Sequence, residues 1–516
     1  MPKLKIQKPN NASGTSIVRF APEPSGYLHI GHTKPIFLNE TIREKFNGKF
    51  ILRFDDTNPQ KESIEYEKAI TEDLGRLGIS IDQVTHSSDY FDKILEYACQ
   101  IIQNGDAYLD DTPTEQMKDE RHKKIPSKFR NVDPQTNLDI FKTKFQTDST
   151  SNWCLRAKIS HDNVNPCLRD PVLMRACNHE HIRYGTKYKV YPTYEFSCPI
   201  VDHLEQITHA ARANEYMSHS DTYKWICKKL GLTKPHIVHF SKISFQQTIM
   251  SKRYLKQLVE AKLVDGWDDP RLPTIRGLWN HGLTKEALKK YIVDMGLNNK
   301  NTLTSWDKLW ATNKKHIDRV IPRYSSVNFT EKTQLTLDNY PLDSSDSELQ
   351  EFVADRHPSN KQLGWKKMWK SKHVFVNQYD SDLFEIGDRV GLLKFAVVEL
   401  KNFQNGVYHC EISEDQDYKT AKHKINWINT DPSTFTKANL VTYGPLITCD
   451  HMDHGDNVLD IFNEDSRTTM DVLIEKAVEE LKTGELLQLE RRGYYRYNGN
   501  NEFIQVPDGR KKAMIN

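Results

Sequence analysis

The sequence predicts an α/β domain built on a parallel sheet, followed by a helical segment and a β-rich C-terminal half. The first observation is a short apolar strand at 16–20, a glycine-containing turn, a helix at 29–46 and a second strand at 50–54. Such a βαβ unit pairs its two strands in parallel through a right-handed crossover. The second observation is a change past residue 330 to alternating polar and apolar runs, which favours barrels of antiparallel strands.

Two more amphipathic helices follow the first βαβ unit. Their last apolar residues are Leu77 and Ile102, and each is followed by a glycine, Gly78 or Gly105. Glycine accepts the left-handed backbone that closes a helix, so these positions predict the helix ends.

The alternation of strands and helices then breaks in a stretch that is rich in charge, which predicts an inserted subdomain. The predicted segments are an N-terminal tail at 1–15, the first half of the α/β domain at 16–110, the insertion at 111–190, the second half of the domain at 191–240, a loop and helical connector at 241–330, and two barrels at 331–516.

Composition excludes several classes of protein. The 516 residues are 37% hydrophobic and carry a formal net charge of +2, so nucleic-acid binding through a bulk positive field is not expected. No apolar run approaches the ~20 residues that a membrane helix needs, and the N-terminal sequence is typical of neither a signal peptide nor a transit peptide. The eight cysteines form no C-x-x-C pair. We therefore expect a cytoplasmic protein with reduced thiols, no membrane contact and no zinc.

Two histidines mark the turn between the first strand and the first helix. In His29-Ile30-Gly31-His32 the two rings share the first helical turn with unpaired backbone N–H groups and the positive end of the helix dipole. Such a corner binds anions, and imidazole N–H groups stabilise a phosphate as its charge grows. Gly31 lets a flat ring such as adenine approach the backbone. The alternative is a pair of exposed histidines near a helix start.

A second motif, Ile249-Met250-Ser251-Lys252-Arg253, leads into a later helix. Lysine and arginine on a mobile loop could hold the β- and γ-phosphates of ATP and stabilise departing pyrophosphate. Alone, such a run is usually a solvated charge cluster. Together, the two motifs indicate a nucleotide-binding α/β enzyme.

The pair resembles the HIGH and KMSKS signatures of class I aminoacyl-tRNA synthetases, the second as an MSKR variant. Stretches such as RFAPEPSGYLHIGH, LRFDDTNP, YPTYEFSCPIVD and VDGWDDPRLPTIRGL look like glutamyl- or glutaminyl-tRNA synthetases of the archaeal/eukaryotic cytosolic type. The resemblance implies a Rossmann-type catalytic domain with an inserted acceptor-binding subdomain, a helical connector and C-terminal β-barrel anticodon-binding domains. It also implies that His29, His32, Lys252 and Arg253 are catalytic. The residues implied for ATP binding are Ala21, Pro22, His29, Gly31, His32, Ile249, Met250, Ser251 and Lys252.

The amino-acid pocket decides between glutamate and glutamine. The resemblance puts Arg212, before the Glu-Tyr pair of THAARANEY, and Arg19, at the end of the first strand, against the substrate side chain. Two guanidinium groups would favour the carboxylate of glutamate, because a buried carboxylate needs a cation. Each arginine could instead form a structural salt bridge.

Three further residues are expected to line the same pocket. Asp55 would bind the α-ammonium group at the carboxyl end of the second strand, while its neighbour Asp56 could simply cap the following turn. Tyr194 would place its hydroxyl against the amino acid, or else pack as a core aromatic. Glu23 would shape the pocket floor.

The resemblance implies a glutamate–tRNA ligase that activates L-glutamate to glutamyl-adenylate and transfers it to the terminal adenosine of tRNA(Glu). ATP would act as its Mg²⁺ complex, and other synthetases or assembly factors are further candidate partners. A glutaminyl-tRNA synthetase, a non-discriminating enzyme and a tRNA-binding scaffold without catalysis stay open as alternatives. Arg212 favours the glutamyl enzyme, and the intact motifs argue against a scaffold.

The β-rich half contains the run Trp365-Lys-Lys-Met-Trp-Lys-Ser-Lys-His373, in which aromatics alternate with cations. Such a run suits an anticodon loop, because RNA loops are bound by stacking and phosphate contacts. Equally, the tryptophans could be core residues beside solvated lysines. Arg491 and Arg492 allow the same two interpretations.

Overall fold

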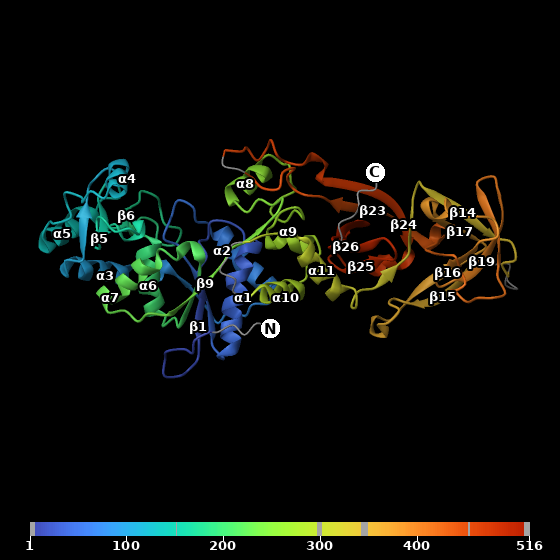
Figure 1. Ribbon diagram of the computed structural model, residues 1–516, viewed down its shortest axis with the longest axis horizontal. Helices are drawn as coiled ribbons and strands as arrows, with labels where there is room; N and C mark the ends of the chain where they lie inside the picture. The colour runs from blue at the N-terminus through green and yellow to red at the C-terminus, as the bar shows by residue number, and fades with distance from the viewer. Residues whose placement is uncertain (1–5, 151, 297–301, 342–348, 453–454, 510–516) are drawn as a thin grey trace. The chain divides into compact units, whose positions relative to one another are not determined.

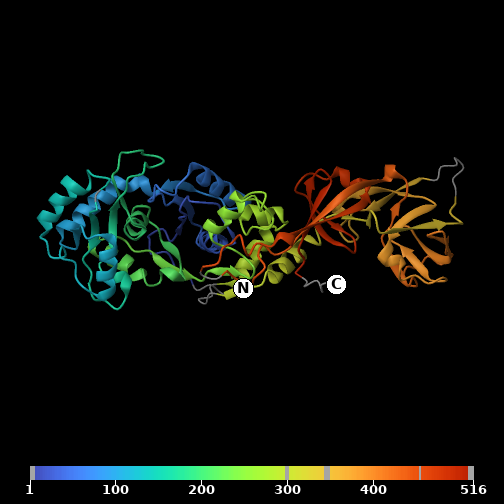
Figure 2. The same cartoon turned by 90° about the horizontal axis from the view of Figure 1, so that it is seen from above.

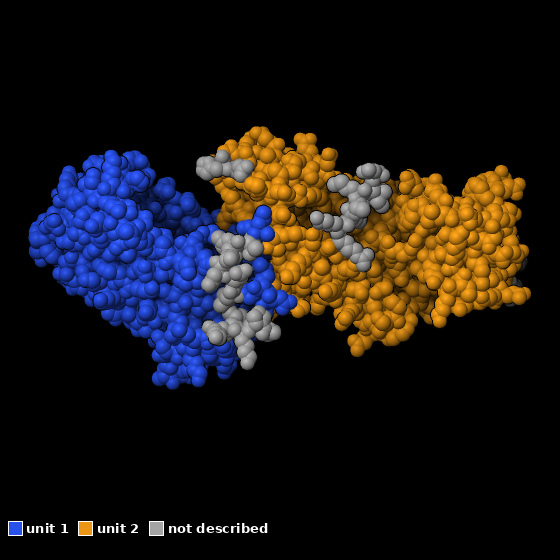
Figure 3. All heavy atoms as spheres, in the orientation of Figure 1, with its two compact units in different colours: residues 1–244, 292–303 blue, residues 245–291, 304–516 orange. Residues whose placement is uncertain are grey.

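The structure is a computed structural model that describes residues 6–150, 152–296, 302–341, 349–452 and 455–509. The chain divides into two compact units, residues 1–244 with 292–303 and residues 245–291 with 304–516 (Figure 3). Each unit has its own hydrophobic core. No helix in these described ranges is long and apolar enough to cross a bilayer.

The first unit is built on a five-stranded parallel sheet with the order β3-β2-β1-β8-β9 (Figure 1). Its strands are β1 (Ile17–Phe20), β2 (Lys49–Phe54), β3 (Gln83–His86), β8 (His209–Ala213) and β9 (His236–Phe240). In chain order the strands run outward from β1 on one side and from β8 on the other. The crevice at the carboxyl ends of β1 and β8 is therefore the switch point at which such sheets bind ligands.

Five helices accompany this sheet, and the predicted α/β fold is confirmed. They are α1 (Ile30–Lys45), α2 (Ile64–Arg76), α3 (Phe91–Gln103), α6 (Tyr194–Leu204) and α7 (Ser220–Leu230). Helix α2 begins where the Ser63 side chain accepts a hydrogen bond from the backbone N–H of Glu65. Helix α7 ends at Gly231, whose φ of 68° suits a residue without Cβ.

An antiparallel sheet interrupts the parallel one. Its strands β4 (Ala107–Asp110), β5 (Cys154–Ala157), β6 (Val172–Ala176) and β7 (Val190–Pro192) pair in chain order. Two helices, α4 (Thr114–Lys123) and α5 (Pro134–Ile140), and a π-helical turn at Phe141–Phe145 lie between β4 and β5. Figure 1 draws these elements mostly in cyan. The sheet thus begins just before the predicted insertion, whose boundaries stay predictions.

Helices and a small ribbon precede the β-rich half. They are α8 (Lys252–Glu260), α9 (Ile275–Asn280), α10 (Lys285–Met295), α11 (Asp307–Ile317) and the strand pair β10 (Ile243–Phe245) and β11 (Thr302–Thr304).

The β-rich half contains two seven-stranded sheets, ordered β12-β25-β26-β27-β23-β24-β13 and β21-β18-β19-β20-β14-β17-β22, and a ribbon of β15 and β16 (Figure 2). The bounds are β12 (Arg323–Tyr324), β13 (Ser326–Asn328), β14 (Lys332–Leu337), β15 (Gln350–Asp355), β16 (Trp365–Lys370), β17 (His373–Asn377), β18 (Arg389–Leu392), β19 (Ala396–Gln404), β20 (Val407–Ile412), β21 (His423–Ile425), β22 (Ile428–Asn429), β23 (Phe435–Tyr443), β24 (Arg467–Glu475), β25 (Leu486–Leu489), β26 (Gly493–Gly499) and β27 (Glu502–Val506), with a short helix α12 (Gln378–Ser381).

In each of the two seven-stranded sheets, a very short connection joins the two edge strands and forces the sheet to curve. In the first sheet the edge strands β12 and β13 are separated by Ser325 alone, and in the second the edge strands β21 and β22 are separated by Asn426 and Trp427. A connection of one or two residues can span only a few ångströms. Each sheet must therefore bend until its two edges meet. This closure agrees with the predicted barrels.

Candidate active site

The two histidines of the first motif are held by the start of α1. His29 is the N-cap residue, and its Nδ1 accepts a hydrogen bond of 3.1 Å from the backbone N–H of Gly31. The backbone N–H of His29 donates in return to Nδ1 of His32 at 3.0 Å. The ring centroids are 3.9 Å apart. Since both Nδ1 atoms accept, the neutral rings carry their protons on Nε2 and present N–H donors there.

The turn before α1 is tied to the end of β2. The backbone N–H of Asp55 donates to the carbonyl of Pro22 at 3.0 Å, and the Ser25 hydroxyl donates to Glu23 at 2.9 Å. The structure therefore brings Pro22 and Glu23, two predicted pocket residues, beside Asp55.

Arg212 lies on β8 as a buried cation without an acceptor. Arg212 is only 3% exposed. Among the described residues, none of its three guanidinium nitrogens has a hydrogen-bond partner. The guanidinium carbon lies 5.1–5.7 Å from the ring centres of Tyr194, Tyr216 and Tyr223, which stabilise a cation through their faces. A buried arginine stays charged, so this site can accept an anion.

Arg19 has a different environment. Its guanidinium donates to Asp202 at 3.0 and 3.3 Å, to the carbonyl of Ala211 at 3.2 Å, and to the Cys198 sulfur at 3.5 Å. Burial alone would raise the pKa of Asp202, but Arg19 and Arg53 outweigh it and hold that pKa well below its usual range. Asp202 is thus ionised and offsets the charge of Arg19. A direct contact of Arg19 with substrate stays a prediction.

Asp55 and Asp56 take separate roles at the end of β2. The carboxylate of Asp56 accepts two hydrogen bonds from Ser88, at 2.8 Å from its backbone N–H and 2.6 Å from its hydroxyl, and is fully buried. Asp55 accepts longer hydrogen bonds of 3.2 Å from Thr57 and Ser87. Loss of hydration, followed by repulsion from Asp56, raises the pKa of Asp55 to about 6. Asp56 is thus the structural carboxylate, and Asp55 is the one suited to a ligand cation.

Sequence reasoning assigned no role to Glu62, Tyr216, Tyr223 or Asp202. Burial raises the pKa of Glu62 to about 8, and the charges of Asp56, Asp55 and Glu23 add to the effect. Acidic groups therefore gather on one side of the site, where an ammonium group would relieve their repulsion. Tyr216 and Asp202 lie in stretches that carried the family resemblance, whereas Tyr223 gave no comparable signal.

The second motif belongs to the second unit. Ile249 is buried in a cluster with Leu255, Leu258 and Val264, and Ser251 is the N-cap residue of α8. Lys252 and Arg253 are the first two residues of that helix, and Arg253 is exposed. The motif thus has an apolar anchor and a basic end.

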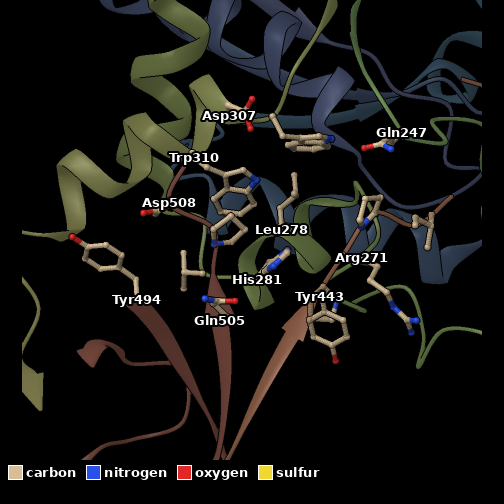
Figure 4. A pocket seen from close by; sticks show the side chains of 18 of the residues that line it. Gln247, Arg271, Leu278, His281, Asp307, Trp310, Tyr443, Tyr494, Gln505 and Asp508 are labelled. Carbon is tan, nitrogen blue, oxygen red and sulfur yellow. The ribbon is translucent and has the colours of Figure 1, made fainter. Parts of the chain in front are cut away.

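A cavity of about 750 Å³ lies in the second unit, and none of the predicted catalytic, ATP-binding or glutamate-binding residues lines it (Figure 4). Trp310, Tyr443 and His281 line it, and burial lowers the pKa of His281 to about 4. Trp306, which also lines it, donates from its indole N–H to the Thr248 hydroxyl at 2.8 Å. The cavity therefore adjoins the residue that precedes the second motif.

In the run at Trp365–His373, buried and exposed side chains alternate at the start of β16, because successive residues of a strand point to opposite faces of the sheet. On β16, Lys366 and Met368 are buried, and Lys366 donates to the carbonyl of Arg323 at 2.7 Å and pairs with Glu475. Trp365 is 59% exposed, so it is available for stacking, whereas Lys366 is structural.

Both arginines of the pair form hydrogen bonds within the protein. Arg491 donates two hydrogen bonds of 2.7 Å to Asp380, and Arg492 donates to Ser326 and Asn328. Arg491 also keeps 37% of its side chain exposed, so an RNA contact by this residue stays a prediction.

Within the described ranges, no group of three or more His, Cys, Asp or Glu side chains is placed to hold a metal ion. All eight cysteines are free thiols.

Comparison with known proteins bears on the whole chain. Residues 16–319 match the family described as tRNA synthetases class I (E and Q), catalytic domain. Residues 321–414 and 424–498 match two anticodon-binding domain families of the same group.

Three curated relatives illustrate the similarity. The chain is 40% identical over 526 residues to a probable cytoplasmic glutamate–tRNA ligase of Schizosaccharomyces pombe, covering 100% of this chain and 71% of that protein. It is 37% identical to the cytoplasmic glutamate–tRNA ligase of Saccharomyces cerevisiae, covering 98% and 72%. Identity to the bifunctional glutamate/proline–tRNA ligase of Mus musculus is 38%, covering 99% of this chain but only 35% of that longer protein.

Proposed function

Because the chain belongs to the class I tRNA synthetases of the E and Q group, we propose that it is a glutamate–tRNA ligase. It activates L-glutamate with ATP and transfers the glutamyl group to the terminal adenosine of tRNA(Glu). Relatives named as glutamate–tRNA ligases match nearly the full chain, which supports this activity over that of the glutamine enzyme.

The observation that carries the choice of amino acid is the unpaired cation Arg212. A buried guanidinium without an acceptor gains most from a ligand that brings a full negative charge. The side-chain carboxylate of glutamate brings that charge, whereas the neutral amide of glutamine would leave Arg212 uncompensated. Arg212 is only 3% exposed and lies beside three tyrosine rings, so solvent screens its charge little and the preference is strong.

The opposite end of the amino acid suits Asp55. Burial and the neighbouring Asp56 raise its pKa to about 6, and the α-ammonium group of glutamate would stabilise its ionised form. Glu23 lies on the same side, whereas Glu62, whose pKa burial raises to about 8, is mostly protonated at neutral pH. The ring of Tyr194 lies 5.7 Å from the Arg212 guanidinium, which suits the proposed contact of Tyr194 with the amino acid.

The reaction needs no protein nucleophile, because the α-carboxylate of glutamate is already ionised. It attacks the α-phosphorus of the Mg²⁺ complex of ATP, which gives glutamyl-adenylate and releases pyrophosphate. The Nε2–H groups of His29 and His32 donate to the phosphate as its negative charge grows. Ala21, Pro22 and Gly31 accept the nucleotide, and Ile249–Arg253 contributes Lys252 and Arg253 to the leaving pyrophosphate. The terminal hydroxyl of tRNA then attacks the adenylate carbonyl and releases AMP.

The proposal extends to partners and segments. Residues 321–414 and 424–498, which match anticodon-binding families, bind the anticodon end, and the exposed ring of Trp365 stacks on a base there. The insertion at 111–190 holds the acceptor end. A cytoplasmic location is proposed because two of the relatives are named as cytoplasmic enzymes. The bifunctional glutamate/proline relative suggests other synthetases as partners.

The test is aminoacylation of purified total tRNA with labelled glutamate and, separately, with labelled glutamine. Glutamate alone should be incorporated. Incorporation of glutamine alone would assign the chain to the glutaminyl enzymes, incorporation on both tRNA types would make it non-discriminating, and tRNA binding without either would leave a scaffold.

A further inference from the structure

The connection between β6 and β7 folds back onto the loop that follows β2. Its tip is a tight turn in which His181 and Gly185 exchange two backbone hydrogen bonds of 2.8 and 2.9 Å. Gly185 has a φ of 55°, which favours a residue without Cβ. This arm, residues 177–189, belongs to the antiparallel insertion, yet its tip contacts the parallel-sheet part of the first unit.

The contact is made by the imidazole of His181. Its side chain is fully buried, lies parallel to the ring of Tyr191 and meets the edge of Phe91. Nδ1 accepts a hydrogen bond of 3.1 Å from the backbone N–H of Arg183. The proton of the neutral ring is therefore on Nε2, which donates to the carbonyl oxygen of Asp56 at 2.9 Å.

A second bridge from the same arm runs beside the first. Nη1 of Arg183 donates to the Ser88 hydroxyl at 2.8 Å and to Asp89 at 2.6 Å. Ser88 in turn donates to the carboxylate of Asp56. The arm thus holds Asp56 from both its backbone carbonyl and its side chain.

These contacts reach Asp55 through Asp56 and Ser87. Asp56, whose carbonyl oxygen accepts from His181, directly follows Asp55 in the chain. The carboxylate of Asp55 accepts a hydrogen bond from Ser87, which directly precedes Ser88. The direction of the Asp55 carboxylate is therefore set by a loop whose far side is fixed by the arm.

We propose that His181 is a positioning residue: its Nε2–H, acting through the Asp56 carbonyl, fixes the Asp55 carboxylate for the amino group of the substrate and couples the inserted subdomain to the amino-acid site. The inference rests on the proposed function, because it assigns Asp55 to the α-ammonium group. It predicts that a change in the arm alters the affinity for the amino acid and leaves ATP unaffected.

The experiment separates hydrogen bonding from packing in the purified full chain. His181→Phe keeps a buried ring and removes the donor, whereas His181→Gln carries an amide N–H that reaches about as far as Nε2. Exposed His179 lies in the same arm, and His179→Phe is the matched control. ATP–pyrophosphate exchange, with tRNA present, gives KM for glutamate, KM for ATP and kcat for each variant.

We expect His181→Phe to raise KM for glutamate about tenfold, the effect of one lost hydrogen bond, with KM for ATP within about twofold. His181→Gln should restore most of the affinity, and His179→Phe should behave as wild type. An unchanged KM for glutamate in His181→Phe, or equal values in the Phe and Gln variants, would overturn the inference, as would a parallel rise of both KM values.

If His181→Phe does not fold, as judged by thermal melting, His181→Asn replaces it, because its shorter amide does not reach the carbonyl. The Gln and Asn variants must then differ in KM for glutamate, and equal values would reject the inference. Absence of glutamate-dependent exchange in the wild type would instead reject the proposed function, so the two failures are distinguishable.

Discussion

Replacing Arg212 with glutamine removes a buried cation and keeps a shorter, neutral polar side chain. In the proposed complex, Arg212 is the partner of the substrate carboxylate. Removing one partner of a buried ion pair costs about 3–5 kcal/mol. At 1.36 kcal/mol for each factor of ten, kcat/KM for glutamate should fall by roughly 150-fold to 5,000-fold. KM for ATP should change by less than about twofold, because Arg212 faces tyrosines and not the nucleotide motif.

The same substitution has an unusual expected effect on stability. In the protein without substrate, the Arg212 nitrogens have no partner in the described structure, and an unsatisfied buried donor costs about 1–3 kcal/mol. The contacts with the tyrosine rings return about 0.5–2 kcal/mol. These terms nearly cancel, so the apparent Tm of Arg212→Gln should equal or exceed that of the wild type.

The assay is ATP–pyrophosphate exchange with tRNA present, varying glutamate and ATP in turn, together with a thermal melt. Arg319→Gln is the matched control, because Arg319 is an exposed arginine in the connection between α11 and β12. A fall in Tm of several degrees with equal losses for glutamate and ATP would refute the reasoning, since Arg212 would then be structural.

Three further outcomes are expected. The pKa of about 6 for Asp55 means that its carboxylate is protonated below that pH and cannot bind the α-ammonium group, so KM for glutamate should rise as pH falls through 6. Asp55→Asn should raise KM above pH 6, where the wild-type carboxylate is ionised, and approach the wild type below it, which flattens this profile; a profile that keeps its shape would point to another group. His32→Ala should lower the rate of adenylate formation by roughly 100-fold to 1,000-fold through loss of a transition-state donor, with tRNA binding unchanged in a filter assay; near-normal exchange would exclude the phosphate role. Lys366→Met leaves Glu475 buried without its cation and should destabilise the barrel by about 3–5 kcal/mol in urea unfolding, whereas Trp365→Ala should weaken tRNA binding and leave unfolding unchanged; the reverse pattern would contradict the assignment by strand parity.

Local patterns were sufficient for most elements of the first unit. Helices α2 and α3 end at Arg76 and Gln103, and their C-cap residues Leu77 and Asn104 directly precede Gly78 and Gly105. These ends were predictable because helix periodicity and a following glycine are both encoded within a few residues. The parallel sheet also followed, since a strand, a helix and a strand in close succession leave one connection of the right hand.

The charge balance of the pocket could not be predicted in the same way. Arg19 and Arg212 looked equivalent in sequence, but Arg19 pairs with Asp202, 183 residues later in the chain, and Arg212 has no such partner among the described residues. For a related reason, the sequence of the run at 365–373 did not show which face of the strand is buried. The alternation is compatible with either face, and Glu475, the partner that allows Lys366 to be buried, lies far along the chain.

The cap at the start of α1 limits how this enzyme can change. The Nδ1 atoms of His29 and His32 accept the hydrogen bonds that close the start of the helix, and the proposed mechanism uses the Nε2–H of each ring, so each imidazole would perform two tasks at once. Serine at position 29 would keep the cap and lose the Nε2–H donor, while lysine would keep a positive group and lose the cap. Histidine meets both demands because one ring nitrogen accepts while the other donates, so few substitutions at these positions would preserve both tasks.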